Sequence, residues 1–171
     1  YMGAELNGKV LGIVGLGRIG QALAARAQAF NMTVIAYEPY TPVEGLGVEY
    51  VELADLYTRA DFISLPPALP DETRGMISAA SIAQMKPGVR LINAARGALI
   101  VEQDLADAVR RGHVAGAALD VYTQEPPSPD NPLIGLPGVV HTPHLAASTY
   151  DAQRAVAVQA AELVVDALLH G

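Results

Sequence analysis

The chain has 171 residues, of which 51% are hydrophobic and 17% charged, so it can bury the core of one compact domain and is not a disordered chain. Its formal net charge of -7 argues against a nucleic-acid partner, and without cysteine it has no disulfide, thiolate metal site or thiol nucleophile. We expect no metal site. No apolar run approaches the roughly 20 residues that cross a membrane, and no signal-peptide pattern opens the sequence, so we expect a soluble, cytoplasmic protein.

Short apolar runs alternate with stretches at helical spacing. The predicted strands are Val10 to Val14, Thr33 to Tyr37, Phe62 to Leu65, Val89 to Asn93 and Ala115 to Val121, with a short sixth at Val139 and Val140. Buried parallel strands are apolar on both faces in this way. The alternation predicts an α/β fold with a doubly wound parallel sheet, and we expect residues 1–171 to form a single domain.

Helical spacing marks the segments between and after these strands. The predicted core-facing stripes are Ile19, Leu23, Ala27 and Phe30 in the first helix, and Leu105, Ala108 and Val109 in a later helix that ends at the cap Gly112. The proline-rich segment from Glu125 to Pro137 predicts a long irregular loop, of the kind that carries function or contacts.

The segment from Ser148 to Leu169 predicts a long C-terminal helix, opened by a capping box of Ser148 and Asp151. Its apolar face comprises Ala155, Val158, Ala161, Val165 and Leu168. We expect this face to pack on the sheet; the alternative is a contact with something outside the chain.

A G-x-G-x-x-G hexapeptide, Gly15-Leu-Gly-Arg-Ile-Gly20, joins the first strand to the first helix. The first glycine permits a tight turn, Gly17 lets the backbone approach a pyrophosphate, and the third permits close packing of helix and sheet. The helix N-terminus adds free N–H groups and a partial positive charge, so we expect this turn, with Arg18 and Ile19, to hold a dinucleotide. The alternative is an ordinary glycine-rich turn.

Glu38 ends the second predicted strand, near the spacing of about 20 residues at which a carboxylate binds the adenosine ribose. It would repel a 2′-phosphate, and no Arg or Lys lies between Thr33 and Val51 to neutralise one. A Rossmann-type domain that prefers NAD over NADP is therefore expected. The alternative for Glu38 is a solvated carboxylate at a strand end.

Three candidate catalytic residues follow three successive strands. Arg96 can grip a substrate carboxylate with two parallel hydrogen bonds, and His144 can exchange a proton with an alcohol or carbonyl near neutral pH. Glu125 would favour the protonated imidazole and orient the ring. Of the other histidines, His113 and His170 are expected at the surface, and His141 is the second choice. Each candidate residue alone could equally be a structural ion pair or a loop cap.

These motifs resemble those of a known family. The segments Gly-Leu-Gly-Arg-Ile-Gly, Asn-Ala-Ala-Arg-Gly, Ala-Leu-Asp-Val-Tyr-Thr-Gln-Glu-Pro and Thr-Pro-His-Leu-Ala-Ala-Ser-Thr look like signatures of the D-isomer-specific 2-hydroxyacid dehydrogenases, in order and spacing. The resemblance implies that Arg96 binds the carboxylate and carbonyl of a small 2-hydroxy or 2-oxo acid, that His144 is the acid/base, and that Glu125 pairs with it. It also places Asp120 near the nicotinamide.

Within the family, the segments Gly3 to Lys9 and Ser148 to Gln153 look most like D-3-phosphoglycerate dehydrogenases, although glyoxylate and hydroxypyruvate reductases share much of this pattern. A formate dehydrogenase is not expected, because that branch of the family has an amide side chain where this chain has Glu125. Ser64 to Pro70 departs from the family, whose members commonly carry a cofactor-contacting His or Asn before the proline there.

Family members have two lobes, and this chain resembles the nucleotide-binding domain without the substrate lobe, an excised or truncated form. It is expected to form a homodimer, because family members dimerise through this domain. The leading interpretation is an NAD-dependent oxidoreductase domain. The alternatives are a non-catalytic NAD-sensing module, since some relatives are transcriptional corepressors, and a structural dimerisation fragment.

Overall fold

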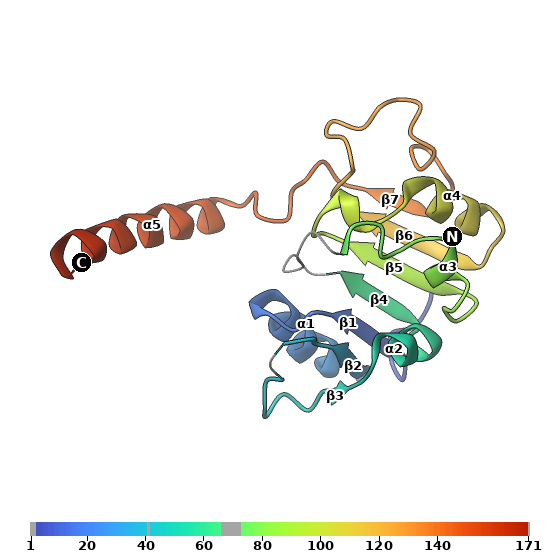
Figure 1. Ribbon diagram of the computed structural model, residues 1–171, viewed down its shortest axis with the longest axis horizontal. Helices are drawn as coiled ribbons and strands as arrows, with labels where there is room; N and C mark the ends of the chain where they lie inside the picture. Colours follow the sequence, from blue (N-terminus) through green and yellow to red (C-terminus); the bar gives the residue numbers. More distant parts are fainter. Residues whose placement is uncertain (1–2, 41, 66–72, 171) are drawn as a thin grey trace.

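The computed structural model describes residues 3–40, 42–65 and 73–170 (Figure 1). Its sheet has seven parallel strands in the order β3-β2-β1-β4-β5-β6-β7. The strand order reverses between β1 and β4, and open α/β sheets bind ligands at the carboxyl ends of the strands at such a point. This is the predicted Rossmann-type architecture, which the structure confirms.

The strands are β1 Val10–Val14, β2 Thr33–Tyr37, β3 Glu49–Tyr50, β4 Phe62–Leu65, β5 Val89–Asn93, β6 Val114–Leu119 and β7 Val139–His141. The helices are α1 Arg18–Ala29, α2 Leu53–Arg59, α3 Ala79–Ile82, the 3-10 turn η2 Gly97–Leu99, α4 Glu102–Arg110 and α5 Tyr150–His170.

Four strands, β1, β2, β4 and β5, have the predicted bounds, and β7 confirms the short sixth strand with one residue more. β6 begins and ends slightly earlier than predicted. β3 was missed because two residues carry no periodic signal; it pairs with β2 at the sheet edge. Part of the segment Ser64 to Pro70, where the family pattern breaks, lies outside the described residues.

The first helix buries a face that only partly overlaps the predicted one. Ile19 and Phe30 are 58% and 61% exposed, whereas Gly20, Ala24 and Ala27 are buried. These three small residues, spaced four and three apart, allow the helix axis to lie close to β1. The apolar periodicity therefore identified the helix, with Ala27 buried and Leu23 partly buried as predicted, but not the exposed ends of the stripe, because the fold selects small residues where the helix lies close to the sheet.

Two clusters of buried side chains lie on the two faces of the sheet. Leu11 and Ile13 of β1 belong to the cluster that includes buried residues of α1, and Val14 belongs to the larger one with residues of α2, α3 and α4. The sheet approaches α2 closely, since a Cβ on Gly12 would lie 2.7 Å from Leu56. α1 packs mainly on β1 and β2, and at the other end of this face Val140 of β7 is 57% exposed.

The segments around α4 follow the sequence prediction with one correction. Gly112 ends the helix with φ +74°, and the N–H of His113 donates to the carbonyl of Ala108, as in a Schellman cap. His113 is half-buried rather than a surface group, and its Nε2 lies 3.1 Å from the Met85 carbonyl. The proline-rich segment contains no helix or strand, as expected.

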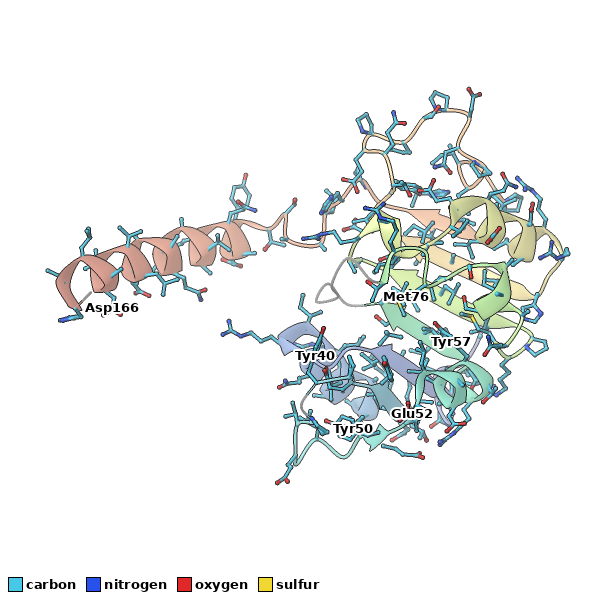
Figure 2. All side chains as sticks on the ribbon, viewed as in Figure 1. Tyr40, Tyr50, Glu52, Tyr57, Met76 and Asp166 are labelled. Carbon is cyan, nitrogen blue, oxygen red and sulfur yellow. The ribbon has the colours of Figure 1, made fainter. Side chains whose placement is uncertain are left out.

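The expected packing of the C-terminal helix on the sheet is wrong. α5 extends away from the domain, and none of its residues is buried (Figure 1). Figure 2 shows its side chains, including the labelled Asp166, projecting around the helix, and Arg18 at the start of α1 lines a surface pocket with some of them. The exposed apolar side chains surround the helix instead of forming one stripe, since Val156, Val164 and Leu169 accompany Val158, Val165 and Leu168. Such a helix has no single face for a sheet to bury.

The capping residue of α5 also differs from the prediction. The N–H of Ala152 donates to the hydroxyl of Thr149 at 3.1 Å, so Thr149 takes the role assigned to Ser148. Within the described part of the chain, no helix combines the length and the apolarity needed to cross a membrane.

Candidate functional site

The candidate residues lie at one edge of the sheet, because each follows the carboxyl end of a parallel strand. The glycine turn follows β1 and Glu38 follows β2, while Arg96, Glu125 and His144 come after β5, β6 and β7. The parallel topology therefore places the predicted cofactor turn and the predicted catalytic residues along the same edge.

Two of the three glycines in the turn are required by the fold itself. Gly15 has φ +93°, which side-chain-bearing residues rarely adopt, and a Cβ on Gly20 would lie 2.5 Å from the carbonyl oxygen of Gly15. Gly17 differs, since its φ is -65° and a Cβ there would meet no atom of the described residues within 4 Å. Among the described residues, therefore, packing does not require a glycine at this position, which fits a ligand approaching the backbone.

Glu38 is tied to the glycine turn. Its Oε2 accepts a hydrogen bond from the N–H of Leu16 at 2.7 Å, and its Oε1 accepts one from the N–H of Tyr40 at 3.1 Å. Each carboxylate oxygen can accept a further hydrogen bond, so the group remains able to bind a hydroxyl. The carboxylate is thus engaged by the backbone and not merely solvated, and its ribose role stays a prediction. Arg18 and Ile19 are exposed beside the same turn.

Arg96 is presented by a tight turn that Asn93 holds together. Asn93 is 1% exposed; its Oδ1 accepts from the N–H of Ala95 at 3.0 Å, and its Nδ2 donates to the carbonyl of Arg96 at 2.9 Å. The guanidinium is exposed and donates to the carbonyl of Ala95 at 2.7 Å, with no carboxylate partner among the described residues. Sequence analysis did not single out Asn93, although an Asn at a strand end before a turn is a recognisable signal.

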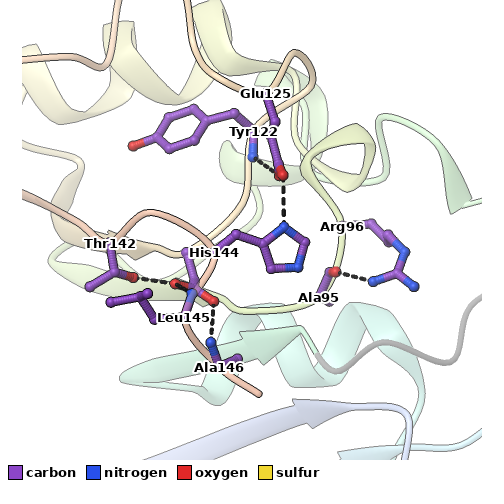
Figure 3. A network of polar contacts seen from close by, with 9 residues as sticks. Ala95, Arg96, Tyr122, Glu125, Thr142, His144, Leu145 and Ala146 are labelled. Atoms are coloured by element: carbon purple, nitrogen blue, oxygen red, sulfur yellow. Dashed lines mark hydrogen bonds and ion pairs between the residues drawn. The ribbon is translucent and has the colours of Figure 1, made fainter. Parts of the chain in front are cut away.

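Glu125 and His144 form the predicted pair (Figure 3). His144 Nδ1 lies 2.7 Å from Glu125 Oε2, and the N–H of Tyr122 donates to Glu125 Oε1 at 3.0 Å. The hydrogen bond from His144, assisted by that from Tyr122, holds the pKa of Glu125 below its ordinary value. Because the ionised carboxylate only accepts, Nδ1 carries a proton and Nε2 is left to exchange one.

Asp120 organises the turn that carries His144. Its Oδ1 accepts from the hydroxyl of Thr142 and from the N–H of Leu145 at 2.8 Å, while Oδ2 accepts from the N–H of Ala146 at 2.9 Å. These bonds flank His144, whose φ of +55° is uncommon for a residue with a side chain. The implied place of Asp120 near a nicotinamide stays a prediction; Asp120 is 8% exposed and largely engaged by the turn.

The carboxyl group of Asp120 is ionised despite its burial. Burial raises its pKa, but the hydrogen bonds from Thr142, Leu145 and Ala146, together with the charge of His144, outweigh burial and hold the pKa below its ordinary value. The ionised form can accept several hydrogen bonds at once, so it suits the clamp that the structure shows.

His141 is chemically unlike His144. Its Nδ1 and the hydroxyl of Tyr122 are hydrogen-bonded, and burial lowers the pKa of His141 and raises that of Tyr122. Both shifts favour the uncharged forms, so a neutral imidazole and a neutral phenol share this hydrogen bond. A cavity of about 410 Å³ is lined by both histidines, Tyr122, Pro126 and Ile134, so the Glu125–His144 pair has mainly apolar surroundings on this side.

Comparison with known proteins agrees with this geometry. Residues 1–146 match the family described as "D-isomer specific 2-hydroxyacid dehydrogenase, NAD binding domain". The chain is 51% identical over 167 residues to D-3-phosphoglycerate dehydrogenase of Mycobacterium leprae, covering 96% of this chain and 31% of that protein. It is 48% identical over 164 residues to hydroxypyruvate reductase of Thermotoga maritima, covering 95% of this chain and 54% of that protein.

Among solved structures, a glyoxylate reductase from Paecilomyes thermophila superposes with a TM-score of 0.93 and 37% identity, over 99% of this chain and 52% of that chain. The chain thus spans about a third of the length of the phosphoglycerate dehydrogenases and about half that of the reductases. The chain belongs to the NAD-binding domain of the D-isomer-specific 2-hydroxyacid dehydrogenases.

Proposed function

We propose that this chain is the cofactor-binding and catalytic part of an NAD-dependent dehydrogenase that interconverts a D-2-hydroxy acid and its 2-oxo acid. The observation that carries the proposal is the Glu125–His144 pair, at 2.7 Å, on the same sheet edge as Arg96, which has no carboxylate partner among the described residues. When bound, NAD would supply the chemistry of accepting a hydride from the hydroxyl-bearing carbon, and NADH that of returning it.

In the oxidation, His144 would take the proton of the substrate hydroxyl at Nε2, and in reduction it would return a proton to the forming alkoxide. Glu125 would hold the ring by accepting from Nδ1, which stabilises the imidazolium that forms. Arg96 would grip the substrate carboxylate with its two-pronged guanidinium and polarise the neighbouring carbonyl.

The cofactor would lie over the glycine turn. Gly17 would admit the pyrophosphate, and the N-terminus of α1 would face it with free N–H groups. Glu38 would accept hydrogen bonds from the ribose hydroxyls and repel a 2′-phosphate, which favours NAD over NADP. Arg18 and Ile19 would cover the turn, and Asp120 would lie under the nicotinamide side of the site.

Our proposal also names a substrate within the range of 2-hydroxy acids. We favour 3-phosphoglycerate as the substrate, because the chain is similar to the D-3-phosphoglycerate dehydrogenase of Mycobacterium leprae. Hydroxypyruvate is the second candidate, because the chain is also similar to a hydroxypyruvate reductase. The test is turnover by the whole protein with 3-phosphoglycerate, hydroxypyruvate and glyoxylate, beside calorimetric binding of NADH. NADH binding without turnover of any 2-hydroxy or 2-oxo acid would favour a non-catalytic NAD-sensing module.

We also propose that the whole protein is a homodimer and that other parts of its assembly cover α5. The support is the exposed apolar surface of α5 and of β7, where Val140 lies. Sedimentation equilibrium of the whole protein would test this, and a monomer at micromolar concentration would contradict it.

A further inference from the structure

Glu102 connects the start of α4 to the segment that carries Glu125. Its Oε1 accepts a hydrogen bond from the N–H of Thr123 at 2.8 Å, and its Oε2 accepts one from Nδ2 of Asn131 at 2.8 Å. We name residues 120–138, between the last residue of β6 and the first of β7, the β6–β7 loop. One side chain of α4 therefore holds this loop at two places, and Glu125 lies between them.

The tie at Thr123 is next to the backbone group that orients Glu125. Tyr122 precedes Thr123, and its N–H donates to Glu125 Oε1 at 3.0 Å. No helix or strand holds the loop between the two ties. The backbone at Thr123 and the side chain of Glu125 are therefore fixed together, and a shift of Thr123 moves the carboxylate that His144 contacts.

The tie at Asn131 is specific in its direction. Asn131 Oδ1 accepts from the N–H of Leu133 at 3.0 Å, which leaves Nδ2 to donate to Glu102. Leu133 is fully buried in the larger core cluster. The amide of Asn131 cannot turn over to suit a donor at position 102 without losing its bond to Leu133.

We propose that Glu102 is a positioning residue for the Glu125–His144 pair, acting through its hydrogen bonds to Thr123 and Asn131 of the β6–β7 loop. The inference rests on the proposed function of that pair, but the geometry it concerns can be measured without substrate or cofactor. Loss of a tie loosens the part of the loop around Glu125, although Arg110 still donates to the Pro132 carbonyl and Leu133 stays buried, so the Glu125 carboxylate spends less time on His144 Nδ1. In the whole enzyme this misplacement lowers kcat more than it changes NADH affinity.

The variant that tests the proposal is Glu102→Gln. The Gln amide oxygen can still accept a hydrogen bond from the N–H of Thr123. The Gln NH₂ group would then face Asn131 Nδ2, and because both groups are donors the hydrogen bond to Asn131 is lost. The double variant Glu102→Gln with Asn131→Asp reverses donor and acceptor and restores both ties. The matched control is Asp104→Asn in the same helical turn, because Asp104 accepts from the N–H of Ala79 at 2.7 Å and has no hydrogen bond to the β6–β7 loop among the described residues.

The first measurement is the titration of the Glu125 carboxyl carbon by NMR. We expect Glu102→Gln to raise the pKa of Glu125 towards its ordinary value, the double variant to restore the parent titration, and Asp104→Asn to leave it unchanged. If Glu102→Gln does not fold, Glu102→Asp, one methylene too short to reach both partners, replaces it and carries the same expectation.

The second measurement is turnover by the whole enzyme. We expect Glu102→Gln to lower kcat about ten- to a hundredfold, with rescue by the double variant and little change in NADH affinity. An unchanged Glu125 titration in Glu102→Gln, or no rescue by the double variant, would overturn the positioning role. If the carboxyl titrations behave as expected while His144→Ala leaves turnover intact, the proposed function fails and the positioning of Glu125 stands.

Discussion

Gly97 and Tyr122 meet backbone to backbone. A methyl group on Gly97 would lie 1.9 Å from the carbonyl carbon of Tyr122 and 2.3 Å from the nitrogen of Thr123. Gly97 directly follows Arg96, and the N–H of Tyr122 donates to Glu125. This contact therefore joins the segment that presents Arg96 to the segment that presents Glu125, and it fixes the separation of the two groups.

Gly97→Ala should push these segments apart. Because the obstacle is backbone rather than a flexible side chain, we expect a loss of about 1–3 kcal/mol in the free energy of unfolding. In the whole enzyme we expect a higher KM for the 2-oxo acid together with a lower kcat. Gly3→Ala is the control, since a Cβ there meets no atom within 4 Å. Parent-like stability of Gly97→Ala by urea unfolding would show that the contact is not as tight as described.

Gly17→Val should abolish NADH binding while leaving the fold stable. No described residue would lie within 4 Å of a Cβ on Gly17, so we expect the new side chain to collide with the ligand and not with the domain. Gly20→Ala is the contrasting variant, because its Cβ would lie 2.5 Å from the Gly15 carbonyl oxygen and should destabilise the fold. Calorimetry with NADH and thermal unfolding measure the two effects. Tight NADH binding by Gly17→Val would rule out the assigned turn.

Glu38→Gln should narrow the preference for NADH over NADPH. The amide oxygen can keep the hydrogen bond from Leu16, so the glycine turn is preserved while the charge that repels a 2′-phosphate is removed. Glu38→Ala loses both the negative charge and the hydrogen bond from Leu16, so it should also weaken NADH binding. The measurement is the ratio of the dissociation constants for NADH and NADPH, obtained by calorimetry for the parent and the variant. Equal affinities of the parent for both cofactors would contradict the ribose role.

His144→Ala should lower kcat of the whole enzyme by about 10²- to 10⁴-fold, with NADH affinity little changed. The physical reason is that the proton donor is lost while the glycine turn is untouched. Glu125→Gln removes the charge that favours imidazolium, so reduction of the 2-oxo acid should fall away at a lower pH than in the parent. A pH–rate profile that Glu125→Gln leaves unmoved would mean that the pair does not act as a unit.

The pH dependence of stability should reveal the Asp120 clamp. The pKa of Asp120 lies below its ordinary value in the folded protein, so the stabilisation is fully present above about pH 4 and is lost as the pH falls through the folded value. Asp120→Asn should therefore be less stable than the parent at pH 7, and the difference should shrink in acid. Urea unfolding at pH 7 and at several values below 4 measures it. A difference independent of pH would mean that the charge of Asp120 does not hold the turn.

Local sequence patterns determined the strands and the candidate residues. Val10–Val14 and Val89–Asn93 could be predicted to the residue because buried parallel strands are continuous apolar runs bounded by turn residues. Arg96, Glu125 and His144 could be assigned to one edge because each follows a strand of a parallel sheet, whatever the details of packing.

The tertiary structure alone decided which residues touch across the fold. Gly20 faces β1 instead of Ile19 because the close approach to Gly15 admits only small residues. The bonds of Glu102 to Thr123 and Asn131 join residues that are 21 and 29 positions apart, a separation that no periodic pattern encodes. A sequence records the faces and ends of its elements, whereas long-range hydrogen bonds depend on how the loops between those elements close in three dimensions.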